Sequence, residues 1–441
     1  MSGHVGTRPA QPWRAPAMFA GLAALLILEG VTGSWNSALG ILNMGLISAV
    51  MALGLNMQWG YAGLFNTGVV GMVAIGGLAP VLIAMPPVGA AWAGGGLRMA
   101  LALLVAAAVV GLAIGVARRM AKGLPRTLAV IAVLVGGFFL YRALFDPAVA
   151  AIEGVNPASE GYLGGLGLPV LLAWPVGGLL AAGASWMVAK TALGLRSDYL
   201  AIATLGIGEI IVSVLKNEDW LARGVKNVTG IPRPVPYEVA LQQDPGFVAQ
   251  AARVGLAPVQ ASTLWVQLCW SGLFLVVLLV LIFLMERALN SPWGRMMRAI
   301  RDNETAAEAM GKDVKRRHLQ IFVLGGAVIG LAGAMMITLD GQMTPGSYTP
   351  LRFTFVVWLM VILGGSGSNW GAVLGGVLVW YLWVKVEPWG NWLMGWLAAP
   401  LPEGALKAHL IGSAAHMRLL TMGLILLVVL RFSPRGLLPE K

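Results

Sequence analysis

Residues 286–318 read ERALNSPWGRMMRAIRDNETAAEAMGKDVKRRH, the one long and densely charged segment between strongly apolar runs. Ser291-Pro292 predicts a helix start, because proline lacks the N–H that would be unsatisfied at the first helical position. Gly311 is placed to end the helix. Charged residues between these points recur at steps of three and four, so we expect them to share one face of a short helix. They are Arg295, Arg298, Arg301, Glu304 and Glu308.

This charged segment can be interpreted in two ways. A short helix outside a membrane, with an ordered charged face, is suited to binding another protein. A solvated loop that only fixes the orientation of its neighbours would be charged as well. The segment alone leaves both interpretations open.

The composition predicts a membrane protein. Of the 441 residues, 58% are hydrophobic and 11% are charged, with a mean hydropathy of +0.79. Soluble domains carry about a quarter charged residues, so a soluble core does not explain this balance. Apolar runs of about 18 to 25 residues recur, each able to cross a hydrocarbon core of about 30 Å, and we expect about ten to twelve such segments. The predicted fold class is therefore an all-α polytopic membrane protein.

The charge pattern predicts how the chain is oriented. The net charge is +11, and basic residues cluster at the ends of apolar runs, as they do for cytoplasmic loops and not for a nucleic-acid groove. His4 and Arg8 precede the first run, and Arg431 and Arg435 follow the last, so both termini are expected on the cytoplasmic side. The loop 217–263 is charge-balanced and is expected on the outer, periplasmic face.

Two stretches predict irregular backbone within the membrane region. Residues 55–68 hold three glycines and two asparagines, which is unlike a plain lipid-facing helix. Irregular backbone at this depth has to be buried or line water, so the stretch is either a tight turn with close packing or part of a pathway. The apolar run 353–386 is interrupted by Gly-Gly-Ser-Gly-Ser-Asn at 364–369, which predicts a broken or hairpin-like element of the kind transporters use.

One carboxylate, Glu209, lies near the middle of the apolar run 197–217. A carboxylate at membrane depth is costly and normally faces the bundle interior, a partner group or water. We expect a structural or pathway role, the alternative being that the segment boundary lies elsewhere.

Several kinds of chemistry have no motif in the sequence. There is no G-x-x-x-x-G-K-[ST] phosphate loop, no H-E-x-x-H and no dinucleotide fingerprint. The single Cys269 and the four histidines show no disulfide or metal-ligand spacing. We therefore expect no enzyme and no cofactor in this chain, and energy that comes from an ion gradient or from a partner; the charged segment favours a partner.

Six segments, in one order, carry a resemblance to a known family. They are GLN (54–56) with GYAGL (60–64), DYLAIATLGIGEI (198–210), NVTGIP (227–232), PWGR to RAIRDNE (292–304), AAEAMG (306–311) and VILGGSGS (361–368). Together they resemble the permease subunits of branched-chain amino-acid ABC importers, of the LivM type, over about residues 40–435. The segments 97–145 and 387–415 look longer than the family core and have no assigned role.

The resemblance implies a role for the charged segment. Ala-Ala-x-x-x-Gly at 306–311 is similar to the coupling motif of ABC importer permeases, although Thr305 stands where the family has glutamate. The residues implied to contact an ATPase are Arg295, Arg298, Arg301, Glu304, Ala306, Ala307, Glu308 and Gly311. The residues expected along the translocation pathway are Asn56, Tyr61, Asn66, Thr204, Glu209, Gly364 and Gly365.

The resemblance also implies an assembly. The chain would be one transmembrane permease domain (1–441) in the bacterial inner membrane, with the coupling loop at 286–318. A second homologous permease, two cytoplasmic ATPases that use ATP and magnesium, and a periplasmic binding protein delivering leucine, isoleucine or valine would complete it. Urea, short amides or other amino acids are alternative substrates within this class. An ion-coupled secondary transporter acting alone is the alternative outside it, although no internal repeat or coupling-ion site supports it.

Overall fold

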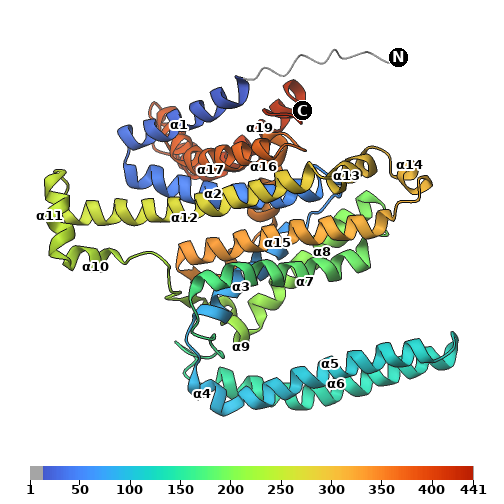
Figure 1. Cartoon of the computed structure of the whole chain (residues 1–441). Coiled ribbons are helices and arrows are strands. Elements are labelled where there is room, and N and C mark those ends of the chain that lie inside the picture. The colour runs from blue at the N-terminus through green and yellow to red at the C-terminus, as the bar shows by residue number, and fades with distance from the viewer. Residues whose placement is uncertain (1–12, 441) are drawn as a thin grey trace.

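The computed structural model describes residues 13–440 and confirms the predicted all-α membrane fold (Figure 1). Within this range, 10 helices are long and apolar enough to cross a membrane, and two shorter apolar helices accompany them. His4 and Arg8, which entered the prediction for the N-terminus, lie outside the described residues.

The main helices follow the predicted apolar runs. They are α1 (Arg14–Thr32), α2 (Trp35–Gln58), α3 (Val69–Ala84), α5 (Leu97–Arg119), α6 (Leu124–Glu153), α7 (Ala173–Ala192), α8 (Ser197–Asn217), α12 (Pro258–Leu289), α15 (Val314–Asp340), α16 (Val356–Gly364), α17 (Asn369–Ala398) and α19 (Met417–Phe432). Most lie roughly parallel or antiparallel in Figure 1, so the bundle has two ends. The end that carries α13 (Pro292–Asp302) and α14 (Glu304–Ala309) is called the α13 end below.

The opposite end carries the 217–263 region. It contains the short helices α9 (Asp219–Ala222), α10 (Glu238–Gln243) and α11 (Pro245–Arg253), of which α10 and α11 project away from the bundle (Figure 1). The strand β1 (Val228–Thr229) pairs antiparallel with β2 (Gln342–Met343), which follows α15. This pairing ties the region to the end of α15.

Glycines let the central helices approach closely. α2 and α15 lie at the core of the bundle, and α15 packs against α7 and α3. A Cβ atom on Gly330 of α15 would overlap the Ala181 side chain and the Gly177 carbonyl of α7. Small residues at such crossings allow two helix backbones to come into van der Waals contact. Packing of this kind is one of the forces that hold helices together in lipid.

We expect Gly330→Val to destabilise the bundle, because valine has no room at this crossing. Overpacking of this kind costs about 1–3 kcal/mol or more, and the upper end is expected here because neither the Ala181 methyl group nor the Gly177 carbonyl can rotate away. The measurement is the midpoint of thermal unfolding of the protein in detergent. Gly183→Val on α7 is the matched control, since in the described part of the chain no atom lies within 4 Å of its Cβ position; equal midpoints for the two variants would contradict the packing argument.

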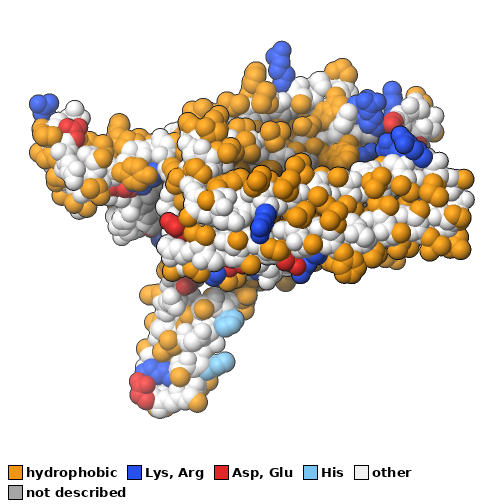
Figure 2. Space-filling model, turned by 90° about the horizontal axis from the view of Figure 1, so that it is seen from below, with side chains coloured by type: hydrophobic (Ala, Val, Ile, Leu, Met, Phe, Trp, Pro, Cys, Tyr) orange, Lys and Arg blue, Asp and Glu red, His pale blue; other side chains and the backbone are white. Residues whose placement is uncertain are grey.

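A helical hairpin of α5 and α6 stands apart from the bundle (Figure 1). It has a small hydrophobic cluster of its own, which includes Met99, Phe145 and Ile152. Its outer surface is largely hydrophobic in Figure 2, with Leu104 and Phe139 well exposed. The segment 97–145, which looked long in the sequence, is thus an appended pair of spans and not part of the packed core.

The interrupted run 353–386 forms a helical hairpin. α16 ends at Gly364, and α17 begins at Asn369. In the turn between them, Gly365 and Gly367 adopt positive φ angles of 120° and 78°. The first part of the stretch 387–415, which has no assigned role in the sequence, continues α17 without a break to Ala398. Pro388 lies inside α17 and does not end it, and residues 399–404 connect α17 to α18 (Ala405–Gly412).

Candidate functional site

The charged segment 286–318 forms two helices and not one. Asn303 between α13 and α14 is extended, with φ −156° and ψ 96°, and its side-chain Oδ1 accepts the N–H of Ala306 at 2.9 Å. The expected common face is therefore wrong, since three arginines lie on α13 and two glutamates, Glu304 and Glu308, lie on α14. Asparagine competes with helical hydrogen bonding in this way and is a preferred N-cap, which is the signal that the spacing argument overlooked.

Both ends of the segment agree with the prediction. Ser291 is the N-cap of α13, and Pro292 is its first residue. Gly311 has φ 76°; its N–H donates to Glu308 O, and the N–H of Lys312 donates to Ala307 O at 3.1 Å. This pair of bonds is a Schellman motif, which requires a left-handed residue at the position that Gly311 occupies.

α13 packs on the bundle through one face, whereas α14 is open to solvent. Gly294, Met297 and Ile300 of α13 are buried. On α14, Glu304, Ala306 and Glu308 are exposed and Ala307 is half-buried, while Met310 just after it is 78% exposed. Arg295 is exposed as well, and its Nη1 donates to the nearby carbonyl of Asn290 at 3.2 Å. α14 is thus the part of the segment available to another protein.

Arg301 connects α13 to two distant parts of the chain. Its Nη1 donates to the carbonyl of Gly60 at 2.6 Å and to Glu440 Oε2 at 2.8 Å. Arg298 Nη1 lies 3.9 Å from the other oxygen of Glu440. Burial alone lowers the pKa of Arg301, but the hydrogen bonds and charges of Glu440 and Asp302 outweigh burial and raise the pKa, so the guanidinium stays charged.

Glu440 is the functional candidate that the sequence analysis missed. It follows the last apolar run in an ordinary polar segment and has no spacing relation to α13. Tyr61 is buried near this group of charges, which consists of the carboxylates of Glu440 and Glu286 and the guanidinium groups of Arg298 and Arg301.

The backbone between α2 and α3 is irregular, as predicted. Residues 59–68 leave the helix after Gln58 and rejoin it at Val69. Asn56 Oδ1 accepts the N–H of Gly367 at 2.8 Å, which ties the end of α2 to the turn between α16 and α17. A Cβ atom on Gly60 would overlap Asn56, so only glycine allows this approach.

The far part of this stretch is held by buried polar side chains. Asn66 is fully buried; its Nδ2 donates to Gln58 Oε1 at 2.7 Å, and its Oδ1 accepts the N–H of Gly68 at 2.8 Å. The N–H of Thr67 donates to Thr204 Oγ1 of α8, and the carbonyl of Thr67 accepts from Thr354 Oγ1. The network satisfies backbone groups that would otherwise be costly at this depth.

The predicted pathway residues therefore fall into separate places. Asn56 and Tyr61 lie near Arg301 and the glycine turn that follows Gly364 and Gly365. Asn66 lies near Thr204 of α8, because the N–H of the next residue, Thr67, donates to Thr204 Oγ1. Glu209 is half-buried one turn beyond them, and among residues 13–440 its Oε1 has no hydrogen-bond partner. Their role in a pathway stays a prediction.

We expect Glu209→Gln to separate stability from activity. If the carboxylate serves transport, the amide should lower uptake about tenfold, while unfolding stays at or above the wild-type midpoint because an uncompensated charge is gone. The measurements are uptake of the transported solute and thermal unfolding. Glu238→Gln, in the half-buried ion pair with Arg233, is the comparison and is expected to impair uptake less; equal tolerance of both would make Glu209 incidental.

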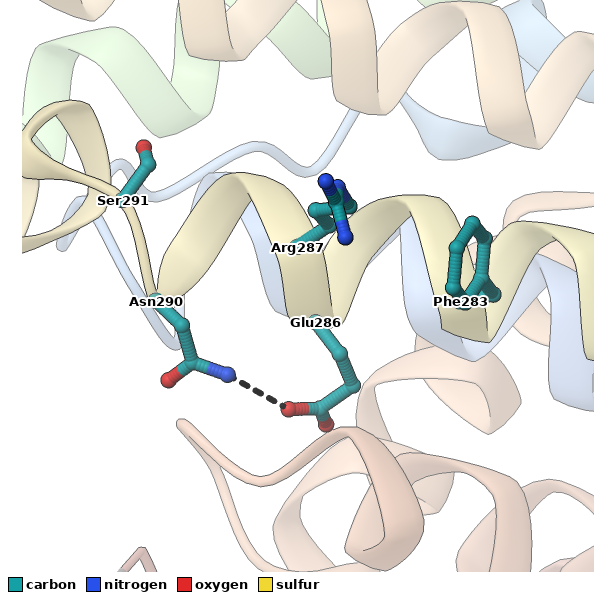
Figure 3. A pocket seen from close by; sticks show the side chains of 5 residues that line it. All are labelled: Phe283, Glu286, Arg287, Asn290 and Ser291. Atoms are coloured by element: carbon teal, nitrogen blue, oxygen red, sulfur yellow. Dashed lines mark hydrogen bonds between the residues drawn. The ribbon is translucent and has the colours of Figure 1, made fainter.

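A shallow surface pocket of about 490 Å³ marks the end of α12 (Figure 3). It is lined by Phe283, Glu286, Arg287, Asn290 and Ser291. Glu286 accepts from Asn290 Nδ2 at 3.4 Å, as Figure 3 shows, and from Asn369 Nδ2 at the start of α17 at 2.9 Å. In the part of the chain described, no group of His, Cys, Asp and Glu could hold a metal ion. The pocket thus lies where Glu286 joins the end of α12 to the start of α17.

Comparison with known proteins identifies similar chains. The sequence model of the family described as "Branched-chain amino acid transport system / permease component" matches residues 149–430, more than half of the chain. This match begins after most of the α5–α6 hairpin and contains both α13 and α14. No solved structure gives a significant match.

Individual relatives agree with the family match. The chain is 33% identical over 208 residues to the high-affinity branched-chain amino acid transport system permease protein LivM of Escherichia coli (strain K12), which is 46% of this chain and 48% of that protein. It is 26% identical over 397 residues to the probable branched-chain amino acid transport permease protein LivM of Methanocaldococcus jannaschii, covering 89% and 90%. The chain thus spans about half the length of the Escherichia coli relative.

Proposed function

The chain belongs to the family of branched-chain amino acid transport system permease components, and from this we propose that it forms part of the membrane pathway of an ATP-driven importer for leucine, isoleucine and valine. A second homologous permease would complete the pathway. A periplasmic binding protein would deliver the amino acid, and two cytoplasmic ATPases, binding ATP and magnesium, would supply the energy. This chain is then a transport component that hydrolyses nothing itself.

We place this chain in the inner membrane of a bacterial cell, with the α13 end facing the cytoplasm. The turn between α5 and α6, with Arg118, Arg119 and Lys122, lies towards the same end as α13 (Figure 1). The segment after α19 also returns to α13, through Glu440. Clustering of basic residues on one side of the membrane is the pattern of cytoplasmic loops. The 217–263 region would then face the periplasm.

One observation carries the proposal: α14 is exposed, while the adjoining α13 is tied through Arg301 to the irregular 59–68 stretch. An ATPase that binds α14 and moves on ATP closure would pull α13 and, through it, the backbone at Gly60. The free energy for this change comes from contacts that differ between the open and closed ATPase pair. The permease would thereby alternate between outward- and inward-facing states.

The test is reconstitution of the chain in proteoliposomes with its second permease, ATPases and binding protein, followed by labelled leucine uptake. Uptake against a gradient should need ATP and should stop when the phosphate-loop lysine of the partner ATPases is replaced by alanine. Accumulation by this chain alone, without nucleotide, would instead support an ion-coupled transporter. Binding of leucine, urea and acetamide to the secreted partner, measured by calorimetry, distinguishes the proposed substrate from the alternative.

A further inference from the structure

The segment that follows α19, residues 433–440, folds back onto the turn between α16 and α17. The N–H groups of Leu437 and Leu438 donate to the carbonyls of Leu363 and Gly364, both at 2.8 Å. These carbonyls end α16, where helical partners run out and a buried carbonyl needs another donor. The segment therefore caps α16 from outside the helix.

Glycines make this contact close. Gly436 has φ 76°, and a Cβ atom on it would overlap Gly365. A Cβ atom on Gly367 would lie 2.7 Å from Glu440 Oε2. The segment and the turn thus fit only because glycine occupies both sides of the contact, and the carboxylate of Glu440 is held at the turn.

The other side of Glu440 faces α13. Its Oε2 accepts from Arg301 Nη1 at 2.8 Å, and its Oε1 lies 3.9 Å from Arg298. Arg301 and Glu440 are three-quarters buried, so this ion pair is screened less than a surface pair. Only Pro439 lies between Leu438 and Glu440, so a displacement of Arg301 reaches the end of α16 through a very short, hydrogen-bonded piece of chain.

We propose that residues 433–440 relay the movement of α13 to the α16–α17 turn, with Glu440 as the positioning residue of the relay. This inference rests on the proposed function, because it concerns how ATPase movement reaches the membrane helices. It adds a second connection to the direct contact between Arg301 and Gly60. α13 then acts on two breaks in the membrane helices together: the 59–68 stretch and the glycine turn.

The test uses two substitutions that break the relay at different links. Glu440→Gln removes the charge that holds Arg301 but leaves the bond from Arg301 to Gly60. Gly436→Ala separates the segment from Gly365 and leaves the ion pair. In the complete reconstituted complex, each should lower leucine uptake per ATP hydrolysed about tenfold. Glu440→Gln weakens a hydrogen bond between two charged groups, and Gly436→Ala displaces the two backbone hydrogen bonds from Leu437 and Leu438 to the end of α16. Glu403→Gln, which neutralises a 90% exposed carboxylate on the far side of α17, is the matched control and should keep the wild-type ratio.

If the two links act in series, the double variant has an expected uptake per ATP hydrolysed that differs from the one expected for a segment that only stabilises the fold. The double variant should have a ratio no lower than the worse single variant, because either break already interrupts the connection. Wild-type ratios in both single variants, or reductions that multiply in the double variant, would overturn the relay. A wild-type complex without leucine uptake would contradict the proposed function instead.

Hydrogen exchange in the purified chain gives a check that needs no transport: the amides of Leu437 and Leu438 should be protected, and unprotected amides would also overturn the relay.

Discussion

Reversing the charges of Arg298 and Arg301 together is expected to reduce leucine uptake by about a hundredfold or more, while the protein still inserts into the membrane. Each hydrogen bond to a charged group contributes about 1.5–3 kcal/mol. Two of the hydrogen bonds of Arg301 leave α13, to Gly60 and Glu440, and a third joins it to the adjacent Asp302. A glutamate at 301 would also face the carboxylate of Glu440. Attraction between α13 and two parts of the bundle would thus become repulsion.

The measurement is ATP-driven uptake in proteoliposomes, with size-exclusion chromatography of the extracted protein to show that it is folded. The matched control reverses Arg118 and Arg119, which change the charge by the same amount at the same end of the bundle but lie on the separate α5–α6 hairpin. Normal uptake by the Arg298 and Arg301 variant would contradict the role of α13 in coupling.

A charge exchange tests which contact of Arg301 matters. Arg301→Glu combined with Glu440→Arg restores an ion pair with the two charges exchanged. It does not restore the hydrogen bond to the Gly60 carbonyl, because a carboxylate at position 301 cannot donate one. We therefore expect partial recovery of uptake relative to Arg301→Glu alone. Full recovery would mean that the contact with Gly60 contributes nothing.

The membrane helices could be predicted from the sequence because hydrophobic length alone determines a span. Gly311 was predictable for a similarly local reason, since few residues other than glycine adopt the left-handed conformation that ends a helix there. The break at Asn303 was missed because the three- and four-residue spacing of charges continues through it. In that short stretch, capping by the asparagine side chain outweighed helix continuation.

The contacts at the site depend on tertiary structure that no local pattern encodes. Arg301 and Glu440 are separated by 139 positions in the sequence. Their neighbours in the sequence resemble those of other charged residues that flank apolar runs. The irregular 59–68 stretch was predictable from its glycines and asparagines, but the partners of those side chains were not. Asn66, for example, is one of the predicted pathway residues, and no local pattern shows that its side-chain amide bonds to Gln58 and Gly68.

Asn66→Ala is therefore expected to affect both stability and uptake. The substitution leaves Gln58 Oε1 and the N–H of Gly68 without their partners in a fully buried place, and each such group costs about 1–3 kcal/mol. The 59–68 stretch should loosen, and uptake should fall by more than about twentyfold because Gly60, the contact of Arg301, belongs to the same stretch. Thermal unfolding and ATP-driven leucine uptake are the two measurements.

Asn66→Asp sharpens this prediction, because it changes one hydrogen bond and keeps the other. A carboxylate still accepts from the N–H of Gly68, but it places an oxygen against Gln58 Oε1, and the Gln58 amide cannot turn without losing its bond to the Phe322 carbonyl at 2.8 Å. Aspartate should consequently be no better than alanine in both measurements, although it is nearly the size of asparagine. Wild-type uptake with aspartate at 66 would show that the Gln58 contact is dispensable and that the stretch is held by Thr204 and Thr354 alone.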